Sequence, residues 1–172
     1  NTLSSISRLA KFGEVDKQHS MIMSLAKFYR LSLNNGQTII TIGSEVEQVQ
    51  AYMSIQLIKY GDRVKVEYRI DPSILALTTI KLILQPFVEN VLQHAWRGDS
   101  IHMRVEGELV SDKVVFRIID DGIGMPLHVA QRLIHAQDKE KLGYGVRNVH
   151  ERIQLYYGKE YGVLIHSRTG IG

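Results

Sequence analysis

The stretch Asp120-Asp121-Gly122-Ile123-Gly124-Met125 combines two carboxylates with two glycines. It follows directly on residues Lys113–Asp120, whose composition predicts a strand. A carboxylate at a strand end can accept a hydrogen bond from an exocyclic amine, and glycines let the backbone approach a flat ligand closely. An ordinary Asp-Gly turn is the alternative interpretation, because short motifs also match by chance.

A second glycine motif, Gly143-Tyr144-Gly145-Val146, opens a predicted helix further along the chain. Glycines before a helix expose backbone N–H groups at the positive end of the helix dipole, which suits a phosphate. A flexible loop that enters a helix is the alternative. The chain has no Walker A sequence, which excludes a P-loop enzyme.

The apolar stretch Leu82–Ala95 predicts a well-buried helix, with Pro86 either in its first turn or kinking it. This helix carries Glu89, Asn90 and His94, and the last two are four residues apart and therefore share a face. An Asn oxygen suits Mg²⁺, which is a hard cation. Three polar groups on an apolar helix indicate a polar cavity beside it, although a satisfied helix-to-loop hydrogen-bond network would also explain them.

Two amphipathic helices are predicted at the start of the chain. The first covers Asn1–Phe12 and ends at Gly13, and the second carries apolar residues from Met21 to Leu33. Asn34-Asn35-Gly36 then predicts a stop and a linker. We expect the two helices to pack on each other or on a partner chain.

A third helix and a strand are predicted after this linker. Ser44 and Glu47 have the spacing of a capping box, and the helix that they would open extends to Tyr60. Residues Arg63–Ile70 alternate between apolar and polar side chains, which predicts a half-buried strand.

Three more strands complete the expected sheet. Ile101–Val110 should pair with Lys113–Asp120 through a hairpin at Ser111-Asp112, and Val163–Ser167 should form a final short strand. The predicted order is helix, strand, helix, strand, strand, loop, helix, strand. We therefore expect helices on one face of a mixed sheet, an α+β fold.

Length and composition restrict the possible functions. A chain of 172 residues can form one domain with a core and a small appendage, and 44% hydrophobic with 23% charged residues is typical of soluble globular proteins. The chain has no cysteine, which excludes disulfides and thiolate metal sites. The net charge of +3 and the dispersed basic residues argue against nucleic acid as a partner. The sequence contains no apolar run of about eighteen residues, and its first residues are not expected to be a signal peptide.

Taken together, the three motifs resemble the N, G1 and G2 boxes of the GHKL ATPase superfamily. The local sequence is similar to the LytS/YesM-type sensor histidine kinases within it. LQPFVENVLQHA at residues 84–95 and GYGVRNVHERI at residues 143–153 resemble conserved blocks of that group. NTLSSI at residues 1–6 and YRLSL at residues 29–33 resemble two more, so that the resemblance covers essentially the whole chain.

The resemblance implies a Bergerat-type two-layer α/β sandwich preceded by a short helical hairpin. Residues 1–36 would be the remainder of the dimerisation and phosphoacceptor helices, and residues 37–172 would be the ATP-binding catalytic domain. The family continues beyond the position of Gly172 with a Thr and a further core strand. The catalytic domain is therefore expected to be C-terminally truncated, with one wall of the adenine pocket missing.

The resemblance also assigns roles in binding ATP and Mg²⁺, the expected cofactors. Asp120 would accept a hydrogen bond from the adenine amine, and Gly122 and Gly124 would let the base approach. Asn90 would hold Mg²⁺, and His94 would approach the phosphates.

Further contacts are implied in and after residues 125–142, which would form an ATP lid, mobile before nucleotide binds. Lys139 could reach phosphate from this lid. The other implied ATP-binding residues are Met125, Lys141, Gly143, Gly145, Val146 and Asn148. Glu89 is the implied catalytic carboxylate, which would either polarise the attacking imidazole or orient the neighbours of Asn90.

The implied activity is transfer of the ATP γ-phosphoryl group to a histidine and then to a response regulator. In the family this histidine would lie just before Asn1, so we do not expect residues 1–172 alone to autophosphorylate. The expected assembly is a homodimer through the helical region. The expected location is the cytoplasmic side of an inner or cell membrane, with attachment only through a part of the protein N-terminal to these residues.

Two other functions are compatible with the motifs. One is a GHKL ATPase that couples ATP binding and hydrolysis to a conformational clamp. Pro86 argues against it, because gyrase-like relatives carry their catalytic Glu at that position, four residues before the Asn. The other is a helical dimerisation module with a degenerate nucleotide site, against which Asn90, Asp120 and the paired glycines argue.

Overall fold

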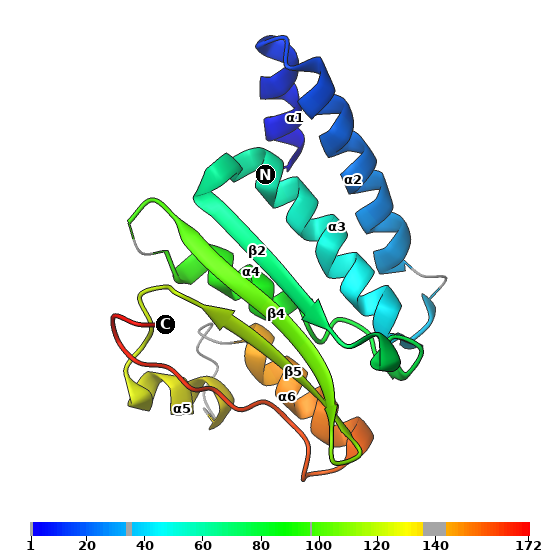
Figure 1. Ribbon diagram of the computed structural model, residues 1–172, viewed down its shortest axis with the longest axis vertical. Coiled ribbons are helices and arrows are strands. Elements are labelled where there is room, and N and C mark those ends of the chain that lie inside the picture. The colour runs from blue at the N-terminus through cyan, green and yellow to red at the C-terminus, as the bar shows by residue number, and fades with distance from the viewer. Residues whose placement is uncertain (1, 34–35, 97, 136–143) are drawn as a thin grey trace.

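The computed structural model describes residues 2–33, 36–96, 98–135 and 144–172. Eleven α-helices and β-strands order these residues, together with two short 3-10 helices at Gly61–Arg63 and Pro72–Ile74 (Figure 1). The eleven are α1 (Thr2–Lys11), α2 (Val15–Leu33), β1 (Ile39–Thr41), α3 (Ile42–Tyr60), β2 (Val64–Ile70), β3 (Thr78–Ile80), α4 (Gln85–His94), β4 (Ile101–Val110), β5 (Lys113–Asp120), α5 (Leu127–His135) and α6 (Tyr144–Tyr157).

The main sheet has the strand order β2-β4-β5. β2 runs parallel to β4, and β4 runs antiparallel to β5, so the predicted mixed sheet is confirmed. Ser111 and Asp112 both have positive φ, 47° and 65°, as a two-residue turn between twisted antiparallel strands requires. A second, two-stranded sheet pairs β1 with β3 and was not predicted.

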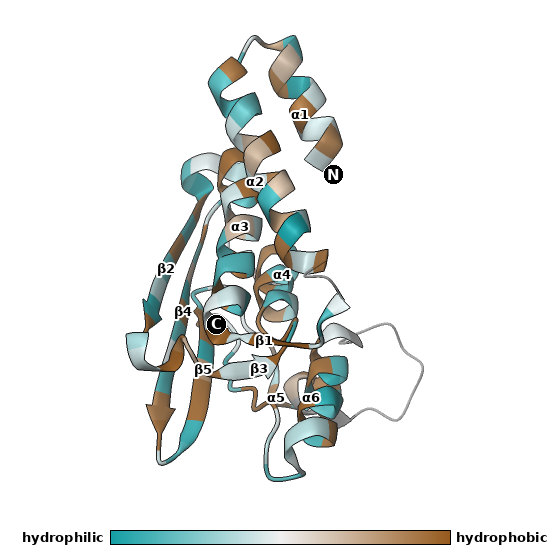
Figure 2. Ribbon diagram, turned by 90° about the vertical axis from the view of Figure 1, so that its right-hand side faces the viewer, coloured by the Kyte–Doolittle hydropathy of each residue, from teal (hydrophilic) through white to brown (hydrophobic). Residues whose placement is uncertain are grey.

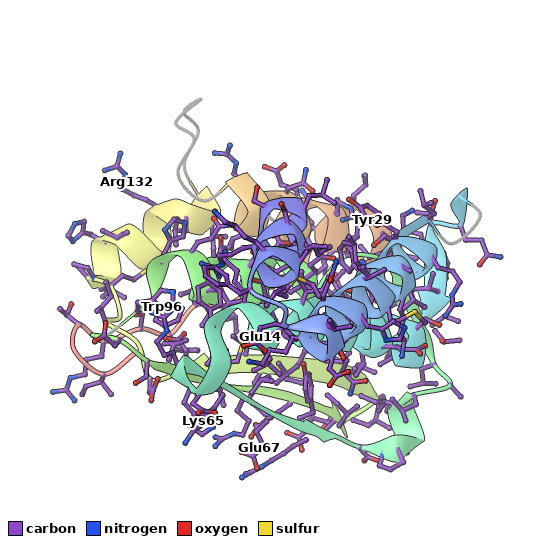
Figure 3. The ribbon with its side chains drawn as sticks, turned by 90° about the horizontal axis from the view of Figure 1, so that it is seen from above. Glu14, Tyr29, Lys65, Glu67, Trp96 and Arg132 are labelled. Carbon is purple, nitrogen blue, oxygen red and sulfur yellow. The ribbon has the colours of Figure 1, made fainter. Side chains whose placement is uncertain are left out.

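Helices α3, α4 and α6 cover one face of the main sheet (Figures 1 and 2). Strand alternation sends one set of side chains into this layer, where Val64, Met103 and Val105 are buried with Val88 of α4 and Val149 of α6. The opposite face carries charged side chains. Lys65 and Glu67 project there, away from the helices (Figure 3).

Helices α1 and α2 form the predicted hairpin, with Gly13 at φ 71° between them. The hairpin projects beyond the sheet, and the C-terminal half of α2 lies along α3 (Figure 1). Lys27 of α2 forms an ion pair with Glu47 of α3 at 2.8 Å, and the rings of Phe28 and Tyr52 lie 5.9 Å apart. In the described ranges, no helix has the combination of length and apolarity that crossing a bilayer requires.

The start of α3 differs from the prediction. The N-cap is Thr41 and not Ser44, because the Thr41 side chain accepts a hydrogen bond from the Ser44 N–H at 3.1 Å. Thr41 also ends β1, and the strand places its hydroxyl at the helix start. The capping box proposed for Ser44 and Glu47 is therefore wrong, and Ser44 lies in the first turn.

The start of α4 also differs. Pro86 lies in the first turn, one of the two positions predicted for it, but the helix begins at Gln85 and not at Leu82. Leu82 has φ 61°, which is incompatible with a right-handed helix. The preceding residues, 81–84, form an irregular segment that enters the helix.

The predicted strand at Val163–Ser167 is wrong as well, because these residues form no ladder with the described part of the sheet. They run instead beside the loop that follows β5. Helix α5 lies within the residues predicted as a lid, where no regular element was expected.

Candidate functional site

Asp120 is the last residue of β5 and lies opposite Met103 of β4. Because Phe116 and Ile118 pack in the core, alternation along the strand directs Asp120 to the same, helix-covered face. Its Oδ1 accepts a hydrogen bond from the Gly122 N–H at 2.9 Å. Burial raises the pKa of Asp120 above its ordinary value, opposed by this N–H and supported by the charge of Asp121. A half-buried carboxylate thus faces the helix layer.

Asp121 has a different role from its neighbour. Its Oδ1 accepts from the His102 N–H at 2.8 Å, and its own N–H donates to the His102 carbonyl at 3.2 Å. These two bonds attach the chain after β5 to the beginning of β4. Asp121 is therefore part of the scaffold, which makes it a natural control for Asp120.

The loop after β5 contacts the C-terminal end of α4. The Ile123 N–H donates to the Ala95 carbonyl at 2.9 Å. A Cβ at Gly122 would lie 2.2 Å from that carbonyl oxygen and 2.6 Å from the Ala95 Cβ, both impossibly close. Only glycine permits this approach, which places the Asp120 carboxylate near the end of α4.

The C-terminal residues of the chain cross the same loop. Gly124 has φ 60°, and a Cβ there would lie 2.2 Å from the Arg168 carbonyl oxygen. The Met125 N–H donates to Ser167 Oγ at 2.8 Å, and the Gly170 N–H donates to the Ile123 carbonyl at 2.7 Å. These contacts take the place of the ladder expected for residues 163–167.

The start of α6 lies against the first turn of α4. A Cβ at Gly145 would lie 3.6 Å from the Pro86 Cβ, an ordinary van der Waals distance. Pro86, Asn90 and His94 follow at intervals of four residues, so they share the face of α4 that meets α6 at Pro86. From Pro86 to Ala95, α4 rises about 14 Å at 1.5 Å per residue, which separates the α6 contact from the Asp120 loop contact along the helix axis.

Glu89 lies on a different side of α4. The Gln85 Nε2 donates to Glu89 Oε1 at 2.7 Å, and the Gln48 Nε2 of α3 donates to Gln85 Oε1 at 2.8 Å. Glu89 is thus the end of a hydrogen-bonded chain that connects α4 to α3. The structure does not bring it together with Asn90 on one face.

The remaining predicted residues fall into three groups. Val146 is buried in the core, Asn148 is exposed on α6, and Met125 is half-buried where the C-terminal residues cross. His94 is exposed at the end of α4. Lys139, Lys141 and Gly143 lie outside the described residues.

The single tryptophan of the chain, Trp96, stands just beyond α4 (Figure 3). Its Nε1–H donates to the Leu92 carbonyl at 2.6 Å, and its ring lies 5.2 Å from that of Tyr60. These contacts fix the end of α4, to which the Asp120 loop is bonded through Ala95.

Sequence reasoning did not identify Glu45 and Arg152. Glu45 is fully buried on α3 and binds the segment before α4, and Arg152 of α6 binds the same segment. The signal was present: Glu45 precedes Val46 and Val49 on a helix face that is otherwise apolar. A charged residue at a core position indicates a specific partner.

A magnesium ion would need ligands from the substrate. Among the described residues, no three His, Asp or Glu side chains cluster as an all-protein cage would require. Mg²⁺ usually takes one or two protein oxygens together with phosphates and waters. One amide oxygen, that of Asn90, fits this arrangement beside a bound triphosphate.

Comparison with known families agrees with this arrangement. The family described as "Histidine kinase-, DNA gyrase B-, and HSP90-like ATPase" matches residues 76–171, which contain α4, β4, β5, α5 and α6. The family described as "Histidine kinase" matches residues 1–64, which contain the hairpin and α3.

Curated relatives match along almost the whole chain. The sensor histidine kinase YesM of Bacillus subtilis is 32% identical over 169 residues, which cover 97% of this chain and 28% of YesM. The sensor protein LytS of Staphylococcus epidermidis is 27% identical over 172 residues, covering 97% of this chain and 29% of LytS. The chain thus spans less than a third of the length of these relatives.

Solved structures share the fold at low sequence identity. The nucleotide-free catalytic domain of the histidine kinase ThkA superposes with a TM-score of 0.52 at 14% identity, covering 67% of this chain and 78% of that domain. The histidine kinase AdeS of Acinetobacter baumannii gives 0.50 at 15% identity, covering 83% and 69%. The expected α/β sandwich behind a helical hairpin is therefore confirmed.

The raised pKa of Asp120 makes a prediction about stability. Because the folded chain holds this proton more tightly than the unfolded chain, the contribution of Asp120 to stability is complete below the ordinary pKa of an unfolded Asp, 3.8. It is lost as the pH rises through the higher folded pKa. Asp120→Asn cannot ionise, so its free energy of unfolding relative to the wild type should rise over this range. Urea titrations at several pH values measure this difference, and a difference independent of pH would contradict it.

Proposed function

The chain belongs to the histidine kinase-, DNA gyrase B-, and HSP90-like ATPase family, and from that premise we propose that it is the ATP-binding catalytic portion of a two-component sensor histidine kinase. One observation carries the proposal: the Asp120 loop meets the end of α4, and the start of α6 meets its first turn. Three motifs far apart in the sequence are thereby arranged along one helix.

In the proposed complex, ATP lies along α4. Asp120 accepts from the adenine amine, and the glycines at 122 and 124 leave room for the base. Asn90 holds Mg²⁺. His94 lies on the same face of α4, but it is next to Ala95 and so lies at the end assigned to the base. We therefore propose that His94 contacts the nucleotide there and not at the phosphates expected from the resemblance.

The phosphate end is assigned to the start of α6. The first N–H groups of α6 lie at the positive end of the helix dipole, which favours phosphate. The residues proposed to contact phosphate there are Gly145, Val146 and Asn148. Lys141 and Gly143 are proposed to contribute from the preceding residues, and Met125 from the other end of the lid.

The proposed reaction transfers the γ-phosphoryl group to a histidine nitrogen. The bond between the γ-phosphorus and the β,γ-bridging oxygen breaks, a phosphorus–nitrogen bond forms, and ADP leaves. A bound Mg²⁺ ion supplies neutralisation of phosphate charge. The chain's own residues hold the base and the phosphates in line with the acceptor. Glu89, which is bonded to α3 through Gln85, is proposed to act from the α3 side of α4.

The hairpin of residues 1–36 is proposed to dimerise, leaving residues 37–172 as the catalytic domain. Exposed apolar side chains of the hairpin, on α1, α2 and the turn between them, support this: Leu3, Phe12, Val15, Met23, Tyr29 and Leu33. The names of YesM and LytS, both called sensors, support a response regulator as the partner and a cytoplasmic position below a membrane sensor. Membrane attachment would then come from another part of the protein.

The first test compares two neighbouring carboxylates. Asp120→Asn should weaken an ATP analogue about tenfold or more, because a charge-assisted hydrogen bond contributes about 1.5–3 kcal/mol. Asp121→Asn removes the same charge from a scaffold residue and should leave affinity almost unchanged. Isothermal calorimetry on folded samples measures both, and equal effects would show that Asp120 is only a turn residue.

Asn90 should act through the metal. Asn90→Ala should weaken nucleotide when Mg²⁺ is present and have little effect when Mg²⁺ is chelated. Gln93→Ala, an exposed change on the same helix, serves as the control. Equal losses with and without the metal would assign Asn90 a structural role.

A clamp ATPase hydrolyses ATP and releases phosphate, whereas a kinase transfers the phosphoryl group to an acceptor. Pro86 supplies no carboxylate where a clamp ATPase is expected to have one, so the chain should bind ATP without releasing phosphate above the chemical background. A coupled phosphate assay on the wild-type chain measures this. Sustained release in the absence of an acceptor would favour the clamp.

A further inference from the structure

The segment before α4 is held by a buried carboxylate. Glu45 of α3 is 0% exposed, and its Oε2 accepts from the Leu82 N–H at 2.8 Å. Its Oε1 accepts from the N–H groups of Ile83 and Leu84 at 2.7 and 2.9 Å. Burial raises the pKa of Glu45, and the three N–H groups and the charge of Arg152 oppose that shift.

The carbonyl side of the same segment is held by α6. Arg152 donates from Nη2 to the Lys81 carbonyl at 2.6 Å and from Nη1 to the Leu82 carbonyl at 3.5 Å. One turn further along α6, Tyr157 Oη accepts from the Ile80 N–H at 3.2 Å. The backbone of residues 80–84 therefore forms hydrogen bonds with side chains of both α3 and α6.

Interactions within residues 80–84 do little to stabilise the conformation of this segment. Leu82 has φ 61°, which a residue with a side chain adopts only at a cost in free energy. Leu84 is the N-cap of α4, and its own side chain makes no capping hydrogen bond. The carboxylate of Glu45 supplies the negative charge that a helix start favours. The conformation therefore depends on Glu45 and Arg152.

The two helices placed by this contact are those assigned to the phosphate end of the nucleotide. α4 carries Asn90, and α6 carries Gly145. The adenine end depends on other contacts, those of the Asp120 loop with Ala95 at the far end of α4. A change in the segment should therefore displace the phosphate contacts more than the base contacts.

We propose that Glu45 and Arg152 are positioning residues for the phosphate end of the ATP site, acting through the backbone of residues 81–84. The inference rests on the proposed function, because it needs ATP to bind along α4. Neither side chain touches the nucleotide. Together they fix the distance and angle between the first turn of α4 and the start of α6.

The experiment measures two ligands, Mg-ATP analogue and adenosine, on each variant of the full chain. Glu45→Gln keeps the shape but turns an N–H donor toward the backbone N–H groups. Arg152→Lys keeps the charge but cannot bridge two carbonyls with one fork, and it disturbs folding less. Each variant should bind the ATP analogue at least about fivefold more weakly while binding adenosine nearly as the wild type does.

Matched controls separate position from charge. Glu47→Gln removes a carboxylate two residues away on α3, whose partner is Lys27, and Arg117→Lys changes an arginine on the outer face of the sheet. Neither should alter the ratio of the two affinities. Because Glu45 and Arg152 act through one segment, the double variant should lose less affinity for the ATP analogue than the product of the single losses.

The outcomes distinguish the two proposals. A wild-type chain that binds neither ligand overturns the proposed function. If the wild-type chain binds both ligands, two results would overturn the positioning role alone. One is a variant that weakens the ATP analogue and adenosine equally. The other is a double variant whose loss of affinity for the ATP analogue equals the product of the two single losses. If Glu45→Gln does not fold, the comparison of Arg152→Lys with Arg117→Lys decides the question. The quantity compared is again the ratio of the affinities for the ATP analogue and adenosine.

Discussion

Three consecutive backbone N–H groups converge on one buried carboxylate, that of Glu45, and the positions of the surrounding helices depend on this contact. A carboxylate buried in a core is costly unless charged or hydrogen-bonding partners surround it, and an irregular backbone buried without acceptors is costly as well. Here the Glu45 carboxylate accepts the hydrogen bonds that the N–H groups of the irregular backbone need. Because Glu45 belongs to α3, and α3 packs on α2, one helix contacts both the hairpin and the segment before α4. Arg152 connects the same segment to α6.

The site itself arises from simple periodicities. Alternation along β5 turns Asp120 toward the helices and leaves its neighbour to bind the β4 backbone, so adjacent residues of the same type have unlike roles. The four-residue spacing on α4 puts Asn90 in line with the turn that meets α6. Gly122 then permits close approach at the C-terminal end of this helix, and Gly145 lies against its first turn. Strand alternation, helix periodicity and the position of glycines thus account for most of the arrangement of the candidate site.

The same local rules explain what could be predicted from the sequence. The turn at Ser111-Asp112 was predictable because its residues and its flanking strands carry the whole signal. The start of α4 was not, since Leu82–Leu84 continue an apolar pattern, and the acceptor for their N–H groups, Glu45, is distant in the sequence. Thr41 caps α3 because β1 pairs with β3, a contact with no sequence signature. Val163–Ser167 has strand composition but pairs with no strand in the part of the chain that the structure describes, so composition alone did not predict its conformation.

The position of Trp96 gives the molecule an optical property. It is the only tryptophan among 172 residues, so selective excitation isolates the signal of a single indole. That indole is bonded to the last turn of α4, directly after Ala95, whose carbonyl holds the loop that follows β5. Movement of this loop or of the end of α4 changes the surroundings of the ring. The intrinsic fluorescence of the unlabelled chain therefore reports on the end of the site that we propose for adenine, without any attached dye.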